Sequence, residues 1–180
     1  MLAWQVKNKA LLIVGGGTVA AGRIIHALEA DANITLVAPR SGLTAEVAHR
    51  IASGEIATYK DREFEEADLE GVYMVLAAID SPQVSTRICK LCREKRIPVN
   101  VADVPSECDF YFGSMHRDGP LQVMISTNGA APKLANLIRV HIARSLPANT
   151  GGGCLNVGKL RRKLRGIAPG PEEGPKRMKW

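Results

Sequence analysis

The chain has 180 residues, of which 46% are hydrophobic and only 4% aromatic, and it carries a net charge of +6. This length accommodates one α/β domain with a smaller appendage, and the aliphatic composition is typical of a parallel sheet covered by helices, which excludes fibrous and disordered classes. No apolar run is long enough to span a bilayer, and the first residues do not form a signal peptide. We therefore expect a cytoplasmic protein with no membrane partner, whose four cysteines remain thiols.

The positive charge is concentrated at the C-terminal end. Residues 139–180 contain ten Lys and Arg against two Glu, a net charge of +8, whereas the preceding residues sum to −2. A basic segment of this kind suits nucleic acid, an acidic surface or a polyanionic small molecule. Because residues 159–165 lack interleaved aromatic side chains for stacking on bases, we expect no nucleic-acid partner.

The first hundred residues alternate between short apolar runs and helical patterns. In chain order they predict strand 10–14, helix 18–30, strand 34–38, helix 43–53, strand 56–59, strand 72–78, helix 82–95 and strand 98–102. This alternation predicts an α/β fold, a Rossmann-type parallel sheet with right-handed crossovers. The acidic stretch at 61–70 is predicted to be a solvated loop or helix face.

The pattern changes after residue 103, where two apolar runs predict antiparallel strands and later runs predict helices. In chain order the predicted elements are strand 110–112, a turn at 117–120, strand 121–126, helix 132–145, a flexible linker at 147–153, a basic amphipathic helix at 155–165 and a mobile segment at 168–175. The predicted domains are therefore a Rossmann domain at 1–112, a small α+β segment at 113–146 and a basic helical segment at 147–180.

A glycine-rich turn directly follows the first predicted strand and opens the first predicted helix. In this context Gly15-x-Gly17-x-x-Ala20 is a dinucleotide fingerprint, in which the first glycine permits the tight turn and the second lets the backbone approach a pyrophosphate at the helix N-terminus. The alternative is a glycine turn that binds no nucleotide. The predicted cofactor-binding residues of the turn are Gly15, Gly16, Gly17, Thr18, Val19 and Ala20.

The second predicted strand lacks the acidic residue that usually ends it in such a fingerprint. It is followed by Pro39 and Arg40, and an arginine there favours a 2′-phosphate and hence NADP. The alternative is that backbone groups around these two residues hold the adenosine ribose without a carboxylate. Local chemistry thus leaves the choice between NAD and NADP open.

Asp103 is the candidate acid or base. It immediately follows the strand at 98–102, and open α/β folds bind their ligands at the carboxyl ends of such strands. The alternative, an aspartate that stabilises a turn before Pro105, applies still more strongly to Asp109.

No metal site is predicted. Cys89 and Cys92 form a C-x-x-C pair, but they fall inside a predicted helix with no second pair of ligands, so half-buried thiols are expected. The four histidines are scattered. No tyrosine is followed four residues later by lysine, which disfavours a short-chain dehydrogenase.

Three ordered blocks, residues 12–20, 98–103 and 126–132, together resemble the precorrin-2 dehydrogenase family of siroheme synthesis. The run at residues 100–113 is most similar to the fungal, bifunctional dehydrogenase/ferrochelatase members, and the resemblance covers essentially the whole chain. It implies oxidation of precorrin-2 to sirohydrochlorin with NAD, followed in bifunctional members by insertion of Fe²⁺. It also implies a homodimer, for which residues 113–146 are the dimerisation segment.

The resemblance also implies roles for particular residues. The aspartate implicated in both reactions falls on Asp103, where a carboxylate can accept the proton that the macrocycle sheds after hydride loss. The NAD-binding positions of the family correspond in this sequence to Thr18, Val19, Pro39 and Arg40. Because the substrate bears eight carboxylates, Lys and Arg of the C-terminal half are expected to bind it.

Thr127 and Asn128 are predicted to line the substrate site, and the alternative is that they form a turn before the helix at Pro132. The resembling fungal enzymes continue into a further helical region, so the C-terminal segment is expected to be truncated, and the ferrochelatase activity is a weaker expectation than the dehydrogenase activity. A rival hypothesis from another class is a non-catalytic dinucleotide-binding redox sensor with a basic partner-binding tail.

Overall fold

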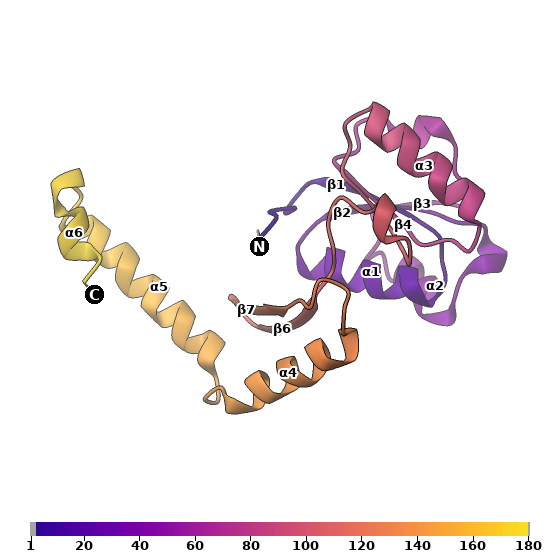
Figure 1. Cartoon of the computed structure of the whole chain (residues 1–180). Coiled ribbons are helices and arrows are strands. Elements are labelled where there is room, and N and C mark those ends of the chain that lie inside the picture. The colour runs from indigo at the N-terminus through magenta and orange to yellow at the C-terminus, as the bar shows by residue number, and fades with distance from the viewer. Residues whose placement is uncertain (1–2, 180) are drawn as a thin grey trace. The chain divides into compact units, whose positions relative to one another are not determined.

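A parallel sheet of five strands forms the first of two units, Met1–Tyr111, in the computed structural model, which describes residues 3–179. The strands are β1 (Ala10–Val14), β2 (Asn33–Val37), β3 (Thr58–Lys60), β4 (Met74–Ala77) and β5 (Val99–Val101). They lie in the order β3-β2-β1-β4-β5 and every neighbouring pair is parallel (Figure 1). The predicted Rossmann-type fold is confirmed.

Helices cover both faces of this sheet. Helices α1 (Thr18–Glu29) and α2 (Ala45–Ala52) lie on one face, and α3 (Pro82–Glu94) lies on the other (Figure 1). Because both faces are covered, the central strand β1 is apolar along its whole length, and Leu12 and Ile13 have no exposed surface. Three 3-10 turns complete the unit: Arg40–Gly42, Glu66–Leu69 and Pro105–Glu107.

The backbone ladder continues past the carboxyl ends of the strands. The residue that follows β1, β4 or β5 donates its N–H to the last carbonyl of a neighbouring strand. These bonds are Gly15 N–H to Val37 O at 2.9 Å, Ala78 N–H to Val14 O at 2.8 Å and Ala102 N–H to Ala77 O at 2.9 Å. The starts of the loops at this edge are therefore fixed relative to one another.

The acidic stretch at 61–70 is not wholly solvated, so that prediction is wrong at Asp68. This side chain has no exposed surface. Its carboxylate accepts hydrogen bonds from Arg62 Nη2 at 2.7 Å, Lys60 Nζ at 2.7 Å and the Glu65 N–H at 2.9 Å. These donors, Arg62 foremost, hold the pKa of Asp68 well below its usual range despite burial. A buried carboxylate persists only when it is paired in this way.

The second unit, Phe112–Trp180, consists of one antiparallel hairpin and helices. Its elements are β6 (Ser114–Asp118), β7 (Leu121–Ile125), α4 (Pro132–Ser145), α5 (Thr150–Ile167), a 3-10 turn (Pro171–Glu173) and α6 (Gly174–Arg177). The predicted strand at 110–112 is wrong. The tight turn at residues 119–120 sets Asp118 opposite Leu121 and Ser114 opposite Ile125, so the five residues of β7 are fully paired without residues 110–112.

The predicted linker at 147–153 is also wrong from residue 150 onward, where α5 begins. Gly151 donates its N–H to Asp118 Oδ2 at 2.7 Å. A Cβ at this glycine would lie 2.1 Å from Asp118 O. The glycine therefore allows the first turn of α5 to approach the hairpin closely, and this tertiary contact outweighs the weak helix propensity of glycine.

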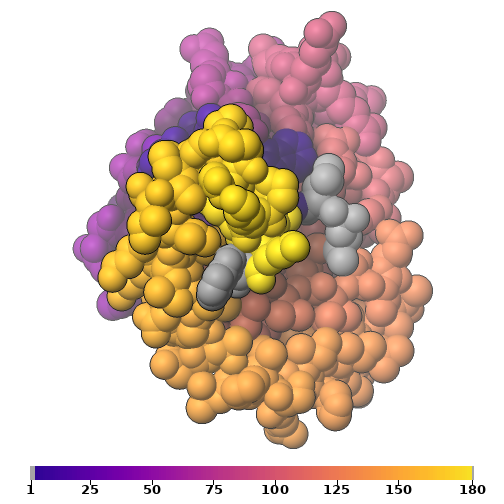
Figure 2. All heavy atoms as spheres, turned by 90° about the vertical axis from the view of Figure 1, so that its left-hand side faces the viewer, coloured from indigo at the N-terminus to yellow at the C-terminus, as the bar shows by residue number. Residues whose placement is uncertain are grey.

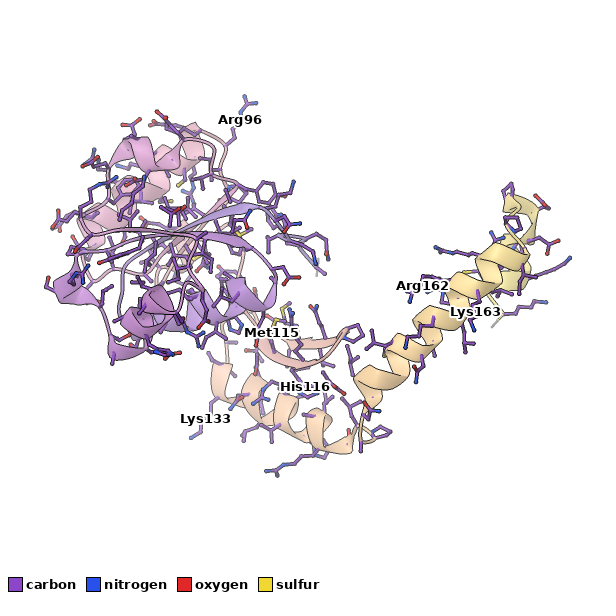
Figure 3. All side chains as sticks on the ribbon, turned by 180° about the vertical axis from the view of Figure 1, so that it is seen from behind. Arg96, Met115, His116, Lys133, Arg162 and Lys163 are labelled. Carbon is purple, nitrogen blue, oxygen red and sulfur yellow. The ribbon has the colours of Figure 1, made fainter. Side chains whose placement is uncertain are left out.

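The basic helix predicted at 155–165 is the middle of α5, which has 18 residues. Arg162 and Lys163 stand out from this helix (Figure 3). The short helix α6 contacts α5 (Figure 1), and in Figure 2 the yellow C-terminal atoms lie against the amber atoms that precede them. The Arg177 guanidinium donates hydrogen bonds to Ala168 O and Gly170 O. Within residues 3–179 no helix is both long and apolar enough to cross a membrane.

Candidate functional site

The glycine turn lies where the sheet order reverses, between β1 and β4. Gly15 has a φ of +113°, and a Cβ there would lie 2.0 Å from Ala78 O, so a side chain cannot be accommodated. A Cβ at Gly16 would meet Leu43 Cδ2 at 2.4 Å, whereas a Cβ at Gly17 would have no atom within 4 Å. Gly15 is thus required by its backbone conformation and by the Ala78 carbonyl, Gly16 is crowded mainly by the tip of a leucine side chain, and Gly17 faces open space, as the approach of a pyrophosphate requires.

The N-terminus of α1 adjoins this open space. Gly17 is its N-cap residue, and within the described chain no side chain caps it and no acidic residue occupies its first turn. Thr18 and Val19 are exposed, whereas Ala20 is completely buried. The N–H groups at this terminus and the helix dipole favour an anion, so the turn fits the phosphates of a dinucleotide.

Asp61 supplies, at the adjacent strand end, the carboxylate that the sequence analysis did not find. It follows β3, which pairs with β2, and so it lies beside Arg40. Its Oδ1 accepts the Arg40 N–H at 2.7 Å, and its Oδ2 accepts Arg40 Nε–H at 2.9 Å. These bonds lower the pKa of Asp61. The signal was available in the predicted fold, because the third strand of a Rossmann sheet lies beside the second.

Asp103 stands two residues beyond β5, at the carboxyl edge that also holds the glycine turn. Its φ of +62° is left-handed, and the Val104 N–H closes the turn by donating to Val101 O at 3.3 Å. The Asp103 side chain is exposed. Asp109 differs, because its Oδ2 accepts the N–H of Val99 at 3.0 Å, which gives it a structural role at the start of β5 and not in a turn.

The Cys108 thiol bridges the turn that contains Asp103. Its Sγ lies 3.0 Å from Val101 O and 3.3 Å from Val104 O, so its single S–H is shared between the first and last carbonyls of the turn. On the other side, Asn100 Nδ2 donates to the same sulfur at 3.3 Å and to a backbone carbonyl, Phe110 O, at 2.8 Å. Burial raises the pKa of Cys108, so the thiol keeps the proton that it donates.

Arg23 is a half-buried cation that the sequence analysis missed. It belongs to α1, and the Asp103 carboxylate acts on it electrostatically. Burial lowers the pKa of Arg23, and the negative charge of Asp103 counteracts that shift. The sequence did not indicate a functional role for this single arginine in a predicted helix, because only the tertiary fold brings it to the end of β5.

The predicted substrate residues Thr127 and Asn128 belong to the second unit, where they form a turn before α4. Thr127 Oγ1 accepts the Ala131 N–H at 3.0 Å, and Asn128 has a φ of +51° and donates its N–H to Ser126 Oγ at 3.1 Å. These bonds favour the turn interpretation that the sequence left open. A role in substrate binding stays a prediction.

The cysteine pair of α3 belongs to the core. Cys89 and Cys92 are 2% and 0% exposed, so they are fully buried instead of half-buried as predicted. Burial raises the pKa of Cys92 to about 12, which disfavours the thiolate form that binds metals. Among residues 3–179, no three or more His, Cys, Asp or Glu side chains lie together in a group able to hold a metal ion.

Comparisons with known proteins decide the family. Three family descriptions match in succession: "Putative NAD(P)-binding" over residues 2–114, "Sirohaem biosynthesis protein central" over 118–145 and "Sirohaem biosynthesis protein C-terminal" over 147–180. Siroheme biosynthesis protein met8 of Schizosaccharomyces pombe is 54% identical over all of this chain, which spans 68% of that protein. The chain belongs to the siroheme biosynthesis family.

Other family members differ in length. The siroheme synthase of Thioalkalivibrio sulfidiphilus is 36% identical over 93% of this chain, which spans only 34% of that protein. Among solved structures, SirC, a precorrin-2 dehydrogenase, superimposes with a TM-score of 0.70 at 26% identity, covering 89% of this chain and 78% of its own. The siroheme-family resemblance and the NAD(P)-binding domain inferred from the sequence are both confirmed.

Proposed function

We propose that this chain is an NAD-dependent precorrin-2 dehydrogenase that produces sirohydrochlorin. The observation that carries the proposal is the placement of Asp103 and the glycine turn at the same carboxyl edge of one sheet. An exposed carboxylate beside a dinucleotide site suits a reaction that removes a hydride and a proton. The likeness to SirC, a precorrin-2 dehydrogenase, supports the same reaction.

The proposed residues divide the chemistry between them. Bound NAD⁺ supplies the hydride acceptor. Gly17 and the first turn of α1 bind its phosphates, because they offer open space and main-chain N–H groups. Asp103 accepts the proton from the substrate and releases it to water, since its side chain is exposed. Arg23 places a positive charge beside this carboxylate.

The decisive experiment is to mix the full chain with NAD⁺ and precorrin-2 and to follow the appearance of NADH. Asp103→Asn preserves the shape of the side chain and removes the base, so turnover should fall roughly 10²- to 10⁴-fold while NADH affinity is unchanged. The matched control is Asp31→Asn, which removes an exposed carboxylate paired with Lys7 at 2.9 Å. Turnover of Asp103→Asn within twofold of the wild-type rate would remove Asp103 from the mechanism. Dinucleotide binding without any turnover by the wild type would favour the redox sensor.

We also propose that the protein is a homodimer through α4. Leu134, Leu137 and Ile138, spaced along one face of this helix, are 51%, 58% and 38% exposed in the single chain. An apolar stripe of this spacing is normally covered, and the dimer implied by the family resemblance supplies a second copy as the cover. Light scattering should give twice the chain mass for the wild type and the monomer mass for Leu137→Glu. A monomeric wild type would refute the proposal.

Two further expectations stay predictions. Insertion of Fe²⁺ is tested by mixing the protein with sirohydrochlorin and Fe²⁺ and following the macrocycle spectrum, and an unchanged rate relative to buffer would exclude it. A cytoplasmic location is tested by fractionating cells that express the tagged chain.

A further inference from the structure

The loop after β2 holds a paired arginine. Arg40 is 77% exposed and follows a strand end at which an arginine suggests a 2′-phosphate site. However, its main-chain N–H and its Nε–H both donate to the Asp61 carboxylate, at 2.7 Å and 2.9 Å. The guanidinium is thus already directed at a negative charge that the same chain provides.

Backbone and side-chain bonds hold these two loops together. The Ala38 N–H donates to Lys60 O at 3.2 Å, which extends the β2–β3 ladder by one bond. The Tyr59 hydroxyl donates to Ala38 O at 3.0 Å. Asp61 directly follows Lys60, the last residue of β3. Because β3 is hydrogen-bonded to β2, the Asp61 carboxylate lies at the end of β2. The hydrogen bonds from Arg40 lower the pKa of Asp61, and the group is therefore ionised at neutral pH.

We propose that Asp61 is the residue that selects NAD⁺ over NADP⁺ in this enzyme. The proposal rests on the dinucleotide binding in the proposed function. A carboxylate at this strand end can accept hydrogen bonds from the ribose hydroxyls of NAD⁺. The 2′-phosphate of NADP⁺ would meet both the negative charge of Asp61 and an arginine that is already paired, and such repulsion discriminates against the wrong ligand. Asp61 is 44% exposed, so a ligand can reach it.

The test is calorimetric titration of the full chain with NADH and with NADPH, without any tetrapyrrole. Asp61→Ala releases Arg40 and removes the repulsion, so NADPH affinity should rise at least about tenfold relative to NADH affinity. Adding Arg40→Ala to this variant should abolish the gain, because the released guanidinium is what binds the 2′-phosphate. The matched control is Glu55→Gln, which breaks the similar Arg50–Glu55 pair of 2.7 Å and should leave the ratio unchanged.

Equal affinity of the wild type for NADH and NADPH would overturn the proposal, and so would an Asp61→Ala variant with the wild-type ratio. A similar gain in Glu55→Gln would also overturn it, because the effect would then be one of net charge. Failure to oxidise precorrin-2 with intact and selective NADH binding would refute the proposed function alone, since the titration requires no tetrapyrrole.

Discussion

Replacing Cys108 by alanine tests whether the thiol keeps Asp103 in place. The Cys108 Sγ lies 3.0 Å from Val101 O and 3.3 Å from Val104 O, on either side of an aspartate with a left-handed φ of +62°. The S–H is a weak donor, so its net hydrogen bond contributes about 0.5 kcal/mol, the lower end of the usual range, and aspartate tolerates the left-handed conformation better than most residues, at a cost of about 1 kcal/mol or less. The two terms are similar in size, so without the thiol the turn should open for a substantial fraction of the time.

Cys108→Ala should therefore lower the free energy of unfolding by about 1–2 kcal/mol, and a displaced base should lower kcat roughly tenfold or more. Cys108→Ser retains a donor and should recover part of kcat. The control is Cys92→Ala, which removes a sulfur from a completely buried site in α3. Thermal melts and NADH production are measured on all three variants. Equal losses of stability in the two alanine variants, with kcat unchanged in both, would refute the reasoning.

Two further predictions follow from the described contacts. Asp68 has a folded-state pKa below its unfolded value, so its ionised form stabilises the fold above about pH 4, and this stabilisation is lost as the pH falls towards the folded-state pKa. Asp68→Asn should lose about 2–4 kcal/mol at pH 7 and show a weaker acid dependence in urea titrations from pH 3 to 7, whereas parallel curves would contradict the pairing. Gly15→Ala should lower the Tm, because its Cβ would lie 2.0 Å from Ala78 O, whereas Gly17→Ala, with open space around it, should keep the Tm and weaken NADH binding. A Gly17→Ala variant with wild-type affinity would remove this glycine from the site.

The sequence correctly predicted those parts of the fold that depend on residues adjacent in the chain, such as β1 and the turn after it. The apolar run of β1 is followed by glycines because the strand is buried on both faces and the first residue of the turn, Gly15, has no room for a side chain. Asp103 could be placed at the sheet edge because it directly follows such a run. These inferences needed only neighbours in the sequence.

Most of the failures depend on contacts between distant residues. The first strand of the hairpin lies at Ser114–Asp118 because the turn and β7 set its register. Gly151 is helical because it packs closely against Asp118, and a run of glycines in the sequence does not predict this contact. Asp61 was taken for a solvated residue because its partner, Arg40, is 21 positions earlier and meets it only through the pairing of two strands.

The continuous ladder at the carboxyl edge has a consequence for how the protein tolerates change. Only β4 separates β1 from β5, so the strand ends that carry the glycine turn and Asp103 are two strand spacings apart, roughly 10 Å. That separation is a property of the sheet and is independent of the loops on its far side. Insertions between α2 and β3 should therefore accumulate without moving the two sites relative to each other, whereas a substitution that shifts β4 would alter their separation. Sequence drift in this enzyme should be slowest in β4.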